Sequence, residues 1–186
     1  MRKLLWITVF CLFGAVLFAQ QNLSWTMAVI RGSQGVSFSQ PVEMRTGESF
    51  NIIIRARQDC FIYLVAQDSE RQMIVIANRR LRAGEDFQTG FIGLTPPSGS
   101  EQIYVIVSRT EQTGLQDAIT AFIRQNNART GRDLFNAVME IRRSLSAFNE
   151  EPERPVTMAG AFRGTNISAT EYSGAPVYVK SIIINH

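Results

Sequence analysis

Histidine and cysteine are almost absent from this chain, and their scarcity excludes several kinds of active site. The 186 residues contain one histidine, His186, and two cysteines, Cys11 and Cys60. Histidine is the usual general base and a common metal ligand near neutral pH, so a single copy supplies neither a catalytic triad nor a zinc site. No nucleophile-elbow, P-loop or H-E-x-x-H spacing occurs either. We therefore expect no catalytic residue, no metal and no cofactor.

Charge is missing from most of the N-terminal segment. Arg2 and Lys3 precede an apolar run over 4–19 that carries no charged side chain. This pattern is typical of a signal peptide, and we expect cleavage after Ala19. The alternative is a retained N-terminal anchor, although the run is shorter than the roughly 20 residues of a spanning helix. The sequence thus predicts an exported protein, periplasmic or associated with the cell surface, with no membrane span after cleavage.

A strong excess of either charge is also lacking. The chain has 19 basic and 16 acidic residues, and loss of Arg2 and Lys3 leaves a net charge of about +1. This balance argues against nucleic acid as a partner. Residues 20–186 suit a single domain with a sizeable core. Cys60 would be its one cysteine, so we expect no intramolecular disulfide, and the apolar run around it predicts a buried thiol.

Alternating and continuous apolar runs predict strands over much of the domain. One face of a half-buried strand carries Phe50, Ile52, Ile54 and Ala56. The segments predicted as strands are 25–31, 49–57, 60–66, 72–77, 101–108, 156–162 and 177–184, with 78–84 and 164–174 as connecting loops. The segments 60–66 and 72–77 are expected to form an antiparallel hairpin. The strand 101–108, which is continuously apolar over 103–107, is expected to be buried on both faces in the middle of a sheet.

The apolar period changes to that of a helix after the strand 101–108. Two stretches repeat at helical spacing and predict amphipathic helices near 113–125 and 131–148. We expect Thr130 to cap the second helix and Asp133 to lie in its first turn. Strands, a helical pair and strands again predict a mainly β fold, a β-sandwich-like domain with an inserted helical pair. The alternative is an α+β fold with one antiparallel sheet under two helices.

Two of the predicted loops combine basic and apolar residues that suit a binding surface. The first carries Arg79, Arg80 and Arg82, which can bind phosphate or carboxylate through bidentate pairs. The second carries Phe91 and Leu94 beside two prolines, and with the arginines would form a basic rim around an apolar patch. The other interpretation is that the arginines are solvated and that both apolar side chains turn into the core.

A carboxylate-based hydrolase of the envelope is the remaining enzymatic hypothesis. It needs two acids in one cleft, and Glu70, Glu85 and Asp86 are the acids in loops that would supply them. Ordinary solvated turn residues are the other interpretation of the same acids.

The segment 47–69 carries the pattern of a known family. It reads Gly-Glu-Ser-Phe-Asn-Ile-Ile-Ile-Arg-Ala-Arg-Gln-Asp-Cys-Phe-Ile-Tyr-Leu-Val-Ala-Gln-Asp-Ser. Asn78, the Ala83-Gly84 step and a late strand ending in Ser108 continue the pattern. Over about 47–108 the chain resembles the bacterial family called domain of unknown function 4384. It departs from that pattern at Glu70-Arg71, where the family has a hairpin glycine.

The resemblance implies a β-rich envelope or exported module without an established activity, and it implies no catalytic residues. Combined with the signal pattern and the near-neutral charge, it favours a binding or scaffolding module. We expect its partner to be an envelope protein or surface component, whose identity the sequence leaves open.

Overall fold

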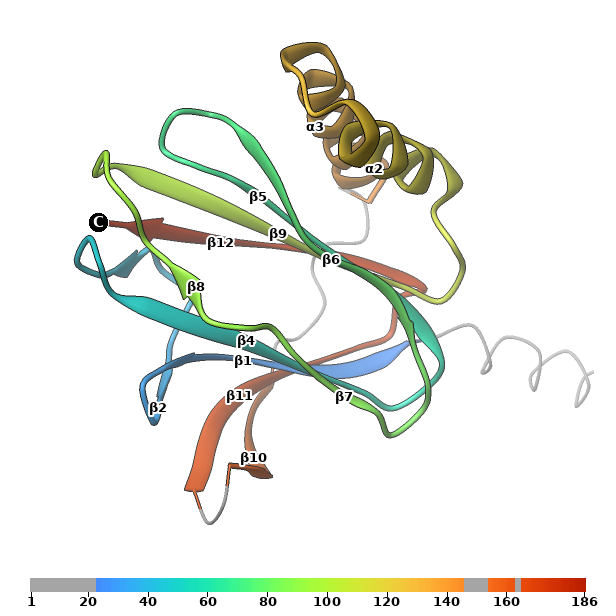
Figure 1. Ribbon diagram of the computed structural model, residues 1–186. Coiled ribbons are helices and arrows are strands. Elements are labelled where there is room, and N and C mark those ends of the chain that lie inside the picture. The colour runs from blue at the N-terminus through green and yellow to red at the C-terminus, as the bar shows by residue number, and fades with distance from the viewer. Residues whose placement is uncertain (1–22, 146–153, 163–164) are drawn as a thin grey trace, which may run out of the picture.

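Two β-sheets face each other, and a helical pair lies on the outer side of one of them (Figure 1). The computed structural model describes residues 23–145, 154–162 and 165–186. Its strands are β1 (Ser24–Arg31), β2 (Gln34–Val36), β3 (Val42–Glu43), β4 (Ser49–Ala56), β5 (Cys60–Gln67), β6 (Met73–Leu81), β7 (Asp86–Gln88), β8 (Ile92–Gly93), β9 (Ser100–Ser108), β10 (Arg154–Phe162), β11 (Thr165–Ser173) and β12 (Val177–Asn185). The helices α2 (Thr113–Gln125) and α3 (Ala128–Ser144) follow β9. The predicted β-sandwich with an inserted helical pair is confirmed, and the single-sheet α+β alternative is wrong.

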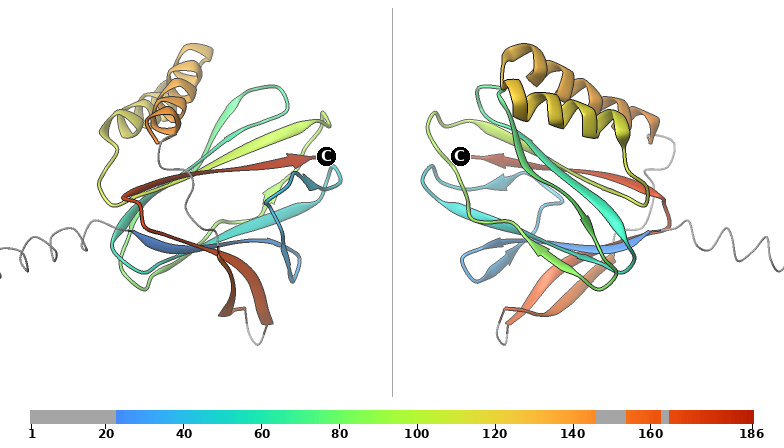
Figure 2. Two further views of the ribbon diagram at one scale, coloured as in Figure 1. Left: turned by 180° about the vertical axis from the view of Figure 1, so that it is seen from behind. Right: turned by 45° about the vertical axis from the view of Figure 1, so that its right-hand side comes forward.

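The strand order shows how the chain builds both sheets. The seven-stranded sheet A has the order β10-β11-β1-β4-β7, with β2 added to β1 and β8 added to β4. The five-stranded sheet B has the order β3-β12-β9-β5-β6, and its pairs are antiparallel except β12 with β3. Strands that follow the helices join both sheets, as the two views in Figure 2 show.

The main core lies between the inner faces of the sheets. The alternating residues of β4 that were predicted to share a buried face are all in it, at 0% exposure: Phe50, Ile52, Ile54 and Ala56. The opposite face of β4 was expected to face solvent, which holds for the partly exposed Arg55 but not for the middle of that face. Ile53 is buried there in a second apolar cluster with Ala28 and Ile30 of β1 and with Ile167 of β11. The polar residue Asn51 is also buried.

The strand predicted for 101–108 is β9, at the centre of sheet B. Every residue from Ile103 to Val107 is at most 2% exposed. The inner face contributes Ile103, Val105 and Val107 to the main core. Tyr104 and Ile106 on the outer face pack under the helices. The continuous apolar run therefore reflects burial on two faces, as predicted.

The helical pair covers the outer face of sheet B. Leu115, Ile119 and Phe122 of α2 and Leu134 and Val138 of α3 are buried in one cluster. From the sheet, that cluster contains Tyr63 and Val65 of β5, Met73 of β6, and Tyr104 and Ile106 of β9. The tyrosine hydroxyl of Tyr63 also accepts a hydrogen bond of 3.0 Å from the backbone N–H of Gln112, just before α2. Within the described residues, neither helix has the length and apolar character needed to cross a membrane.

The helix junction corrects the predicted cap. Asn126 ends α2 in a left-handed conformation, and Asn127 begins α3 as its N-cap. Asn127 Oδ1 accepts hydrogen bonds from the backbone N–H groups of Arg129 and Thr130, and the Thr130 hydroxyl oxygen accepts one from the backbone of Asn127. Thr130 is thus the N3 residue of a capping box and not the cap itself. The helix starts earlier than predicted, so Asp133 lies beyond its first turn.

Two segments predicted as loops are partly or wholly strands. Asn78 to Leu81 belong to β6, so that strand is longer than the predicted 72–77. Residues 165–173 form β11, which pairs with β10 on one side and with β1 on the other. Both segments were assigned to loops because they are polar. The predicted cleavage site and the end of the second predicted helix lie outside the described residues.

The β5–β6 turn is shaped by Asp68 and Arg71. The Asp68 carboxylate accepts hydrogen bonds from the backbone N–H groups of Glu70 and Gln72, at 3.0 and 2.7 Å. Arg71 has a φ of 65°, a left-handed conformation that favours glycine. The turn thus places a charged side chain in a conformation that glycine adopts most readily.

Cys60 is buried as predicted, at the first position of β5. Its side chain is 1% exposed, and burial raises the pKa of the thiol to about 11. Both effects oppose reaction, since the thiolate is the reactive form. At pH 8 we expect labelling by a maleimide to be at least about 100-fold slower in the folded protein than in urea. Mass spectrometry of timed samples measures it, and equal rates in both states would contradict the burial.

Candidate functional site

The sequence pointed to five residues for binding, and the structure separates them. Arg79 and Arg80 lie in β6 and Arg82 in the turn that follows it. Phe91 is 78% exposed just before β8, whereas Leu94 is 1% exposed and packs in the main core. Leu94 is therefore not available to a partner. Phe91 thus faces solvent, as the binding interpretation requires, whereas Leu94 turns into the core, as the other interpretation holds.

Phe91 also lies at a different position along sheet A from the arginines. β8 pairs with Ser49 and Phe50 at the start of β4, whereas β7 pairs with the segment 53–55 near its end. The turn that carries Arg82 leads directly into β7. The proposed basic rim around an apolar patch is thus replaced by a different grouping, in which other arginines take the place of Phe91 and Leu94.

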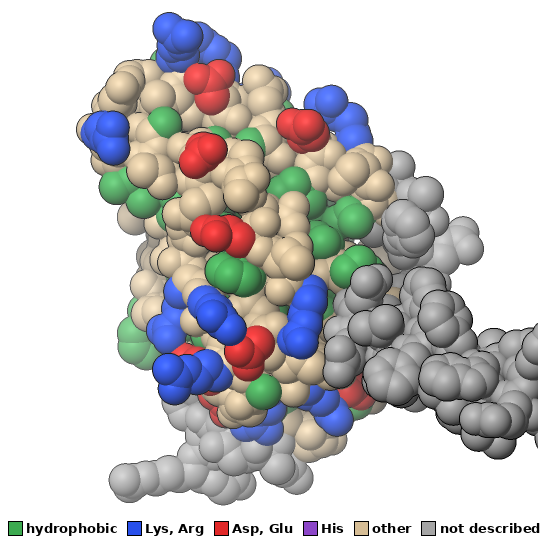
Figure 3. All heavy atoms as spheres, turned by 90° about the vertical axis from the view of Figure 1, so that its right-hand side faces the viewer, with side chains coloured by type: hydrophobic (Ala, Val, Ile, Leu, Met, Phe, Trp, Pro, Cys, Tyr) green, Lys and Arg blue, Asp and Glu red, His purple; other side chains and the backbone are tan. Residues whose placement is uncertain are grey.

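Five arginines gather where β4, β6 and β9 end, and we call this group the arginine cluster. Its members are Arg57, Arg79, Arg80, Arg82 and Arg109. The strand registers explain why they meet. Phe61 of β5 pairs with Arg80 of β6 on one side and with Ser108 of β9 on the other. Figure 3 looks onto this end of the sandwich and shows basic side chains, with acidic ones among them, below the helical layer.

Two carboxylates orient the cluster. Asp59 accepts a hydrogen bond of 2.8 Å from the Arg80 guanidinium and one of 3.0 Å from the backbone N–H of Ala83. Glu85 likewise accepts from the Arg79 guanidinium at 2.6 Å and from the backbone N–H of Arg82 at 2.9 Å. The bond from Ala83, followed by the Arg80 side chain, lowers the pKa of Asp59 from its usual value. Asp59 is therefore ionised at neutral pH and holds Arg80 in place.

An aromatic ring lies close to the guanidinium group of each of the same two arginines. The Arg79 guanidinium carbon lies 5.6 Å from the centre of the Phe87 ring, and that of Arg80 lies 6.0 Å from the centre of the Phe61 ring. Both distances are within the range of a cation–π contact. A planar guanidinium fixed by a ring and a carboxylate loses less freedom when it binds an anion.

The arginines line two hollows that share Arg80. One, of about 440 Å³, is lined by Arg57, Gln58, Asp59, Phe61, Arg80, Ala83 and Arg109. The other, of about 670 Å³, is lined by Arg79, Arg80, Arg82 and Glu85 and is open to solvent. Within the described residues, ion pairs with carboxylates engage Arg57, Arg79 and Arg80 but neither Arg82 nor Arg109. Each hollow has more arginines than acids, so each attracts an anion.

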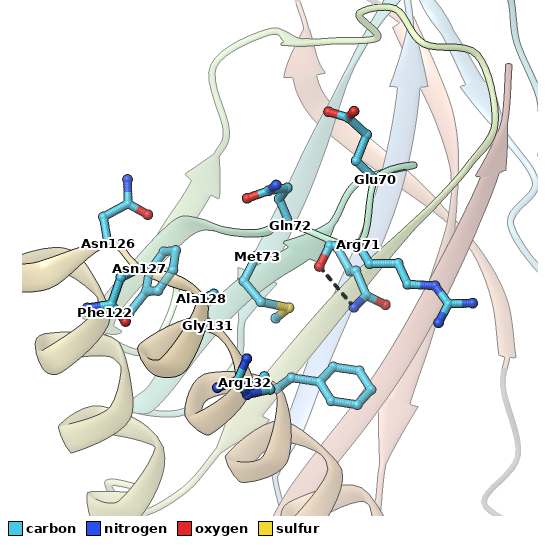
Figure 4. A pocket seen from close by; sticks show the side chains of 12 residues that line it. Glu70, Arg71, Gln72, Met73, Phe122, Asn126, Asn127, Ala128, Gly131 and Arg132 are labelled. Atoms are coloured by element: carbon cyan, nitrogen blue, oxygen red, sulfur yellow. Dashed lines mark hydrogen bonds between the residues drawn. The ribbon is translucent and has the colours of Figure 1, made fainter.

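A third hollow lies between the β5–β6 turn and the junction of α2 and α3, and we call it the hairpin groove (Figure 4). Its volume is about 470 Å³. Met73 from β6 and Phe122 and Phe135 from the helices give it an apolar floor. Gly131 brings the backbone of α3 close to this floor, because a Cβ there would lie 3.7 Å from the Phe122 ring and 3.9 Å from Met73. Charged and amide side chains form the rim: Gln67, Glu70, Arg71, Gln72, Asn126 and Arg132.

The acids considered for hydrolysis do not converge. Glu85 pairs with Arg79, and Asp86 forms a bidentate pair with Arg55 at 2.6 and 2.7 Å. Glu70 lies in the turn before β6, at the opposite end of that nine-residue strand. Because Glu85 contacts Arg79 near the far end of β6, most of the strand, roughly 20 Å, separates Glu70 from Glu85. Glu70 therefore shares no cleft with either of the other two acids.

The single histidine has an environment that sequence reasoning missed. The His186 side chain is fully buried, with Nε2 at 3.3 Å from Oε1 of Glu101 and Nδ1 at 3.1 Å from the hydroxyl of Thr46. Burial raises the pKa of Glu101, although the nearby His186 opposes the change. The available signal was strand alternation, because His186 continues the buried face of Ile182 and Ile184. A buried imidazole offers no access to a substrate, and this chain of contacts joins the end of β12 to the start of β9.

No group of three or more metal-binding side chains occurs among the described residues. Nor does any family model, curated protein or solved structure match this chain. The resemblance to domain of unknown function 4384 therefore stays a prediction, and the functional argument rests on the geometry of the sites above.

Proposed function

We propose that this chain is an exported binding module of the cell envelope, and that its arginine cluster recognises a phosphate or carboxylate on an envelope component. The observation that carries the proposal is that five arginines line two hollows that have Arg80 in common. Arginine is suited to these anions because its planar N–H groups match their oxygen atoms. Export is supported by the signal pattern of residues 1–19 and by what the family resemblance implies.

Binding without catalysis agrees with the chemistry of the cluster. Its anion-binding groups are guanidinium groups, which stay protonated in proteins and so do not act as general bases. Asp59 and Glu85 are each held by an arginine and by a backbone N–H. These interactions hold both carboxylates in a fixed orientation, which suits recognition of a partner rather than proton transfer.

The first test removes the charge from one side of the cluster. The Arg79→Ala, Arg80→Ala, Arg82→Ala triple variant is expected to bind pyrophosphate and citrate at least about tenfold more weakly than the wild type. Isothermal titration calorimetry at low salt measures the affinity. Exposed ion pairs add little to stability, so the variant is expected to fold, which circular dichroism checks.

The matched control removes the same charge from the helices. Arg124, Arg129 and Arg142 are exposed on α2 and α3, and their triple alanine variant changes the net charge equally. It is expected to keep wild-type affinity for both anions. A pull-down from an envelope fraction with the same proteins then tests the partner. If the cluster variant retained binding of anions and of any captured component while folded, the arginine cluster would not be the site.

A further inference from the structure

β6 forms a long edge of sheet B. It is the last strand in the order of that sheet, and within the described residues its backbone pairs with β5 alone. An edge strand presents a row of N–H and C=O groups that can pair with another chain. The edges β3 and β7 are too short for this, with two and three residues, and the edge strand β10 contains Pro155. β6 has nine residues and no proline, and one irregularity at Ile76 interrupts its pairing with β5.

The side chains of β6 divide it into two halves. The first half is apolar, and Ile74 is 46% exposed while Val75 and Ile76 are half-buried. The second half carries Arg79 and Arg80, both exposed and both in the arginine cluster. Positive side chains on an edge strand oppose pairing between two copies of the same chain. The same charges favour a strand that carries acidic side chains.

The two ends of β6 lead to two of the hollows. Met73, its first residue, lies in the floor of the hairpin groove, and Arg79 and Arg80 near its other end line the arginine hollows. Figure 4 shows Met73 and Phe122 facing one another from the strand and the helix. A strand laid along β6 would therefore have an apolar contact at one end and cationic contacts at the other.

We propose that β6 binds an extended peptide segment of an envelope protein by strand addition, with apolar side chains beside the first half of β6 and acidic side chains at the arginine cluster. Strand addition gives affinity through backbone hydrogen bonds and specificity through alternate side chains. The expectation of acidic side chains in the peptide rests on the proposed function of the arginine cluster. The expectation of backbone pairing rests on the β6 edge and is independent of that function.

The probes are synthetic peptides of about eight residues, a length that covers most of the strand. They alternate valine and threonine and carry glutamates at either the N-terminal or the C-terminal end, because strand addition can be parallel or antiparallel. Fluorescence anisotropy with the full chain is expected to show binding for one of the two. Replacing its glutamates with lysines is expected to weaken the affinity at least about tenfold.

Backbone pairing is tested by methylation of the peptide nitrogen atoms. An added strand pairs through only one of its edges, and the N–H groups of alternate residues point to that edge. Methyl groups on one set of alternate residues should therefore abolish binding, and methyl groups on the other set should leave it largely unchanged. Amide hydrogen exchange followed by NMR is the second measurement. The outward N–H groups of β6 are expected to exchange more slowly in the complex, while α2 and α3 stay unchanged.

The outcomes separate this proposal from that of the arginine cluster. If both methylated peptides bound equally and β6 amides were not protected, strand addition would be wrong even where the Arg79→Ala, Arg80→Ala, Arg82→Ala variant lost binding. If peptide binding survived in that variant, the proposed contact between acidic side chains and the arginine cluster would be wrong. The Arg124, Arg129 and Arg142 alanine variant is the control for charge. Absence of binding by every peptide, or protection of β6 through a dimer seen by sedimentation, would overturn the proposal.

Discussion

Replacing Trp25 with alanine is expected to lower the free energy of unfolding by about 3–5 kcal/mol. Trp25 in β1 is fully buried in the main core. Its ring stacks on Tyr172 with centroids 4.5 Å apart and an interplanar angle of 19°, and it meets the edge of Tyr178 at 5.9 Å. The substitution removes the largest side chain of the core and leaves a cavity between sheet A and β12. Urea denaturation followed by circular dichroism measures the change.

Two control variants make this prediction specific. Phe91→Ala removes an aromatic ring that is 78% exposed, so it should change the free energy of unfolding by less than about 0.5 kcal/mol. Trp25→Phe keeps a ring and removes an indole N–H that, within the described residues, makes no hydrogen bond. It should therefore cost much less than alanine. Comparable small losses for Trp25→Ala and Phe91→Ala would contradict the placement of Trp25 in the core.

Replacing Leu134 with alanine is expected to cost about 2–5 kcal/mol of unfolding free energy. Leu134 of α3 is fully buried and belongs to the same apolar cluster as Tyr63 and Tyr104 on the outer face of sheet B. Because β5 and β9 are buried on both faces, loss of helix packing exposes strands that also carry the main core. We therefore expect one cooperative transition at a lower urea concentration.

The comparison variant for Leu134 is Ile123→Ala on α2. Ile123 is 64% exposed, so the loss of its side chain should change stability by less than about 0.5 kcal/mol. Circular dichroism reports the helices, and near-ultraviolet signals of the buried tyrosines report the sheet. A Leu134→Ala protein that lost its helical signal while keeping the sheet transition of the wild type would show that the helical layer unfolds separately.

Two strand segments were predicted as loops because the number of polar residues that a strand tolerates depends on its position in the sheet. Arg79 and Arg80 suggested a loop, yet an edge strand has solvent beside it and accepts charged side chains. Residues 165–173 were also assigned to a loop, although Ile167 and Ala169 alternate as buried residues of β11. Polar residues between them obscured the period.

The sequence also did not predict whether a single loop residue points into the core or to solvent. Phe91 and Leu94 occur in one loop with similar composition, and only Leu94 is in the core. Its backbone N–H donates to the carbonyl oxygen of Glu48, and its carbonyl oxygen accepts from the N–H of Gly47. Those bonds tie Leu94 to the start of β4, far away in sequence. Nothing local in the sequence encodes such a contact.

The sequence by itself determined the fold class, because apolar periods of two and of 3.6 residues specify strands and helices wherever one face is buried. It also determined the burial of Cys60 and β9, since both lie in apolar runs. Only the tertiary structure decided the composition of the arginine cluster. Arg57, Arg80 and Arg109 are distant in sequence, and they meet because β5 pairs with β6 and β9 in registers that place Arg80 and Ser108 on either side of Phe61. Register depends on the packing of whole strands, which short sequence patterns do not record.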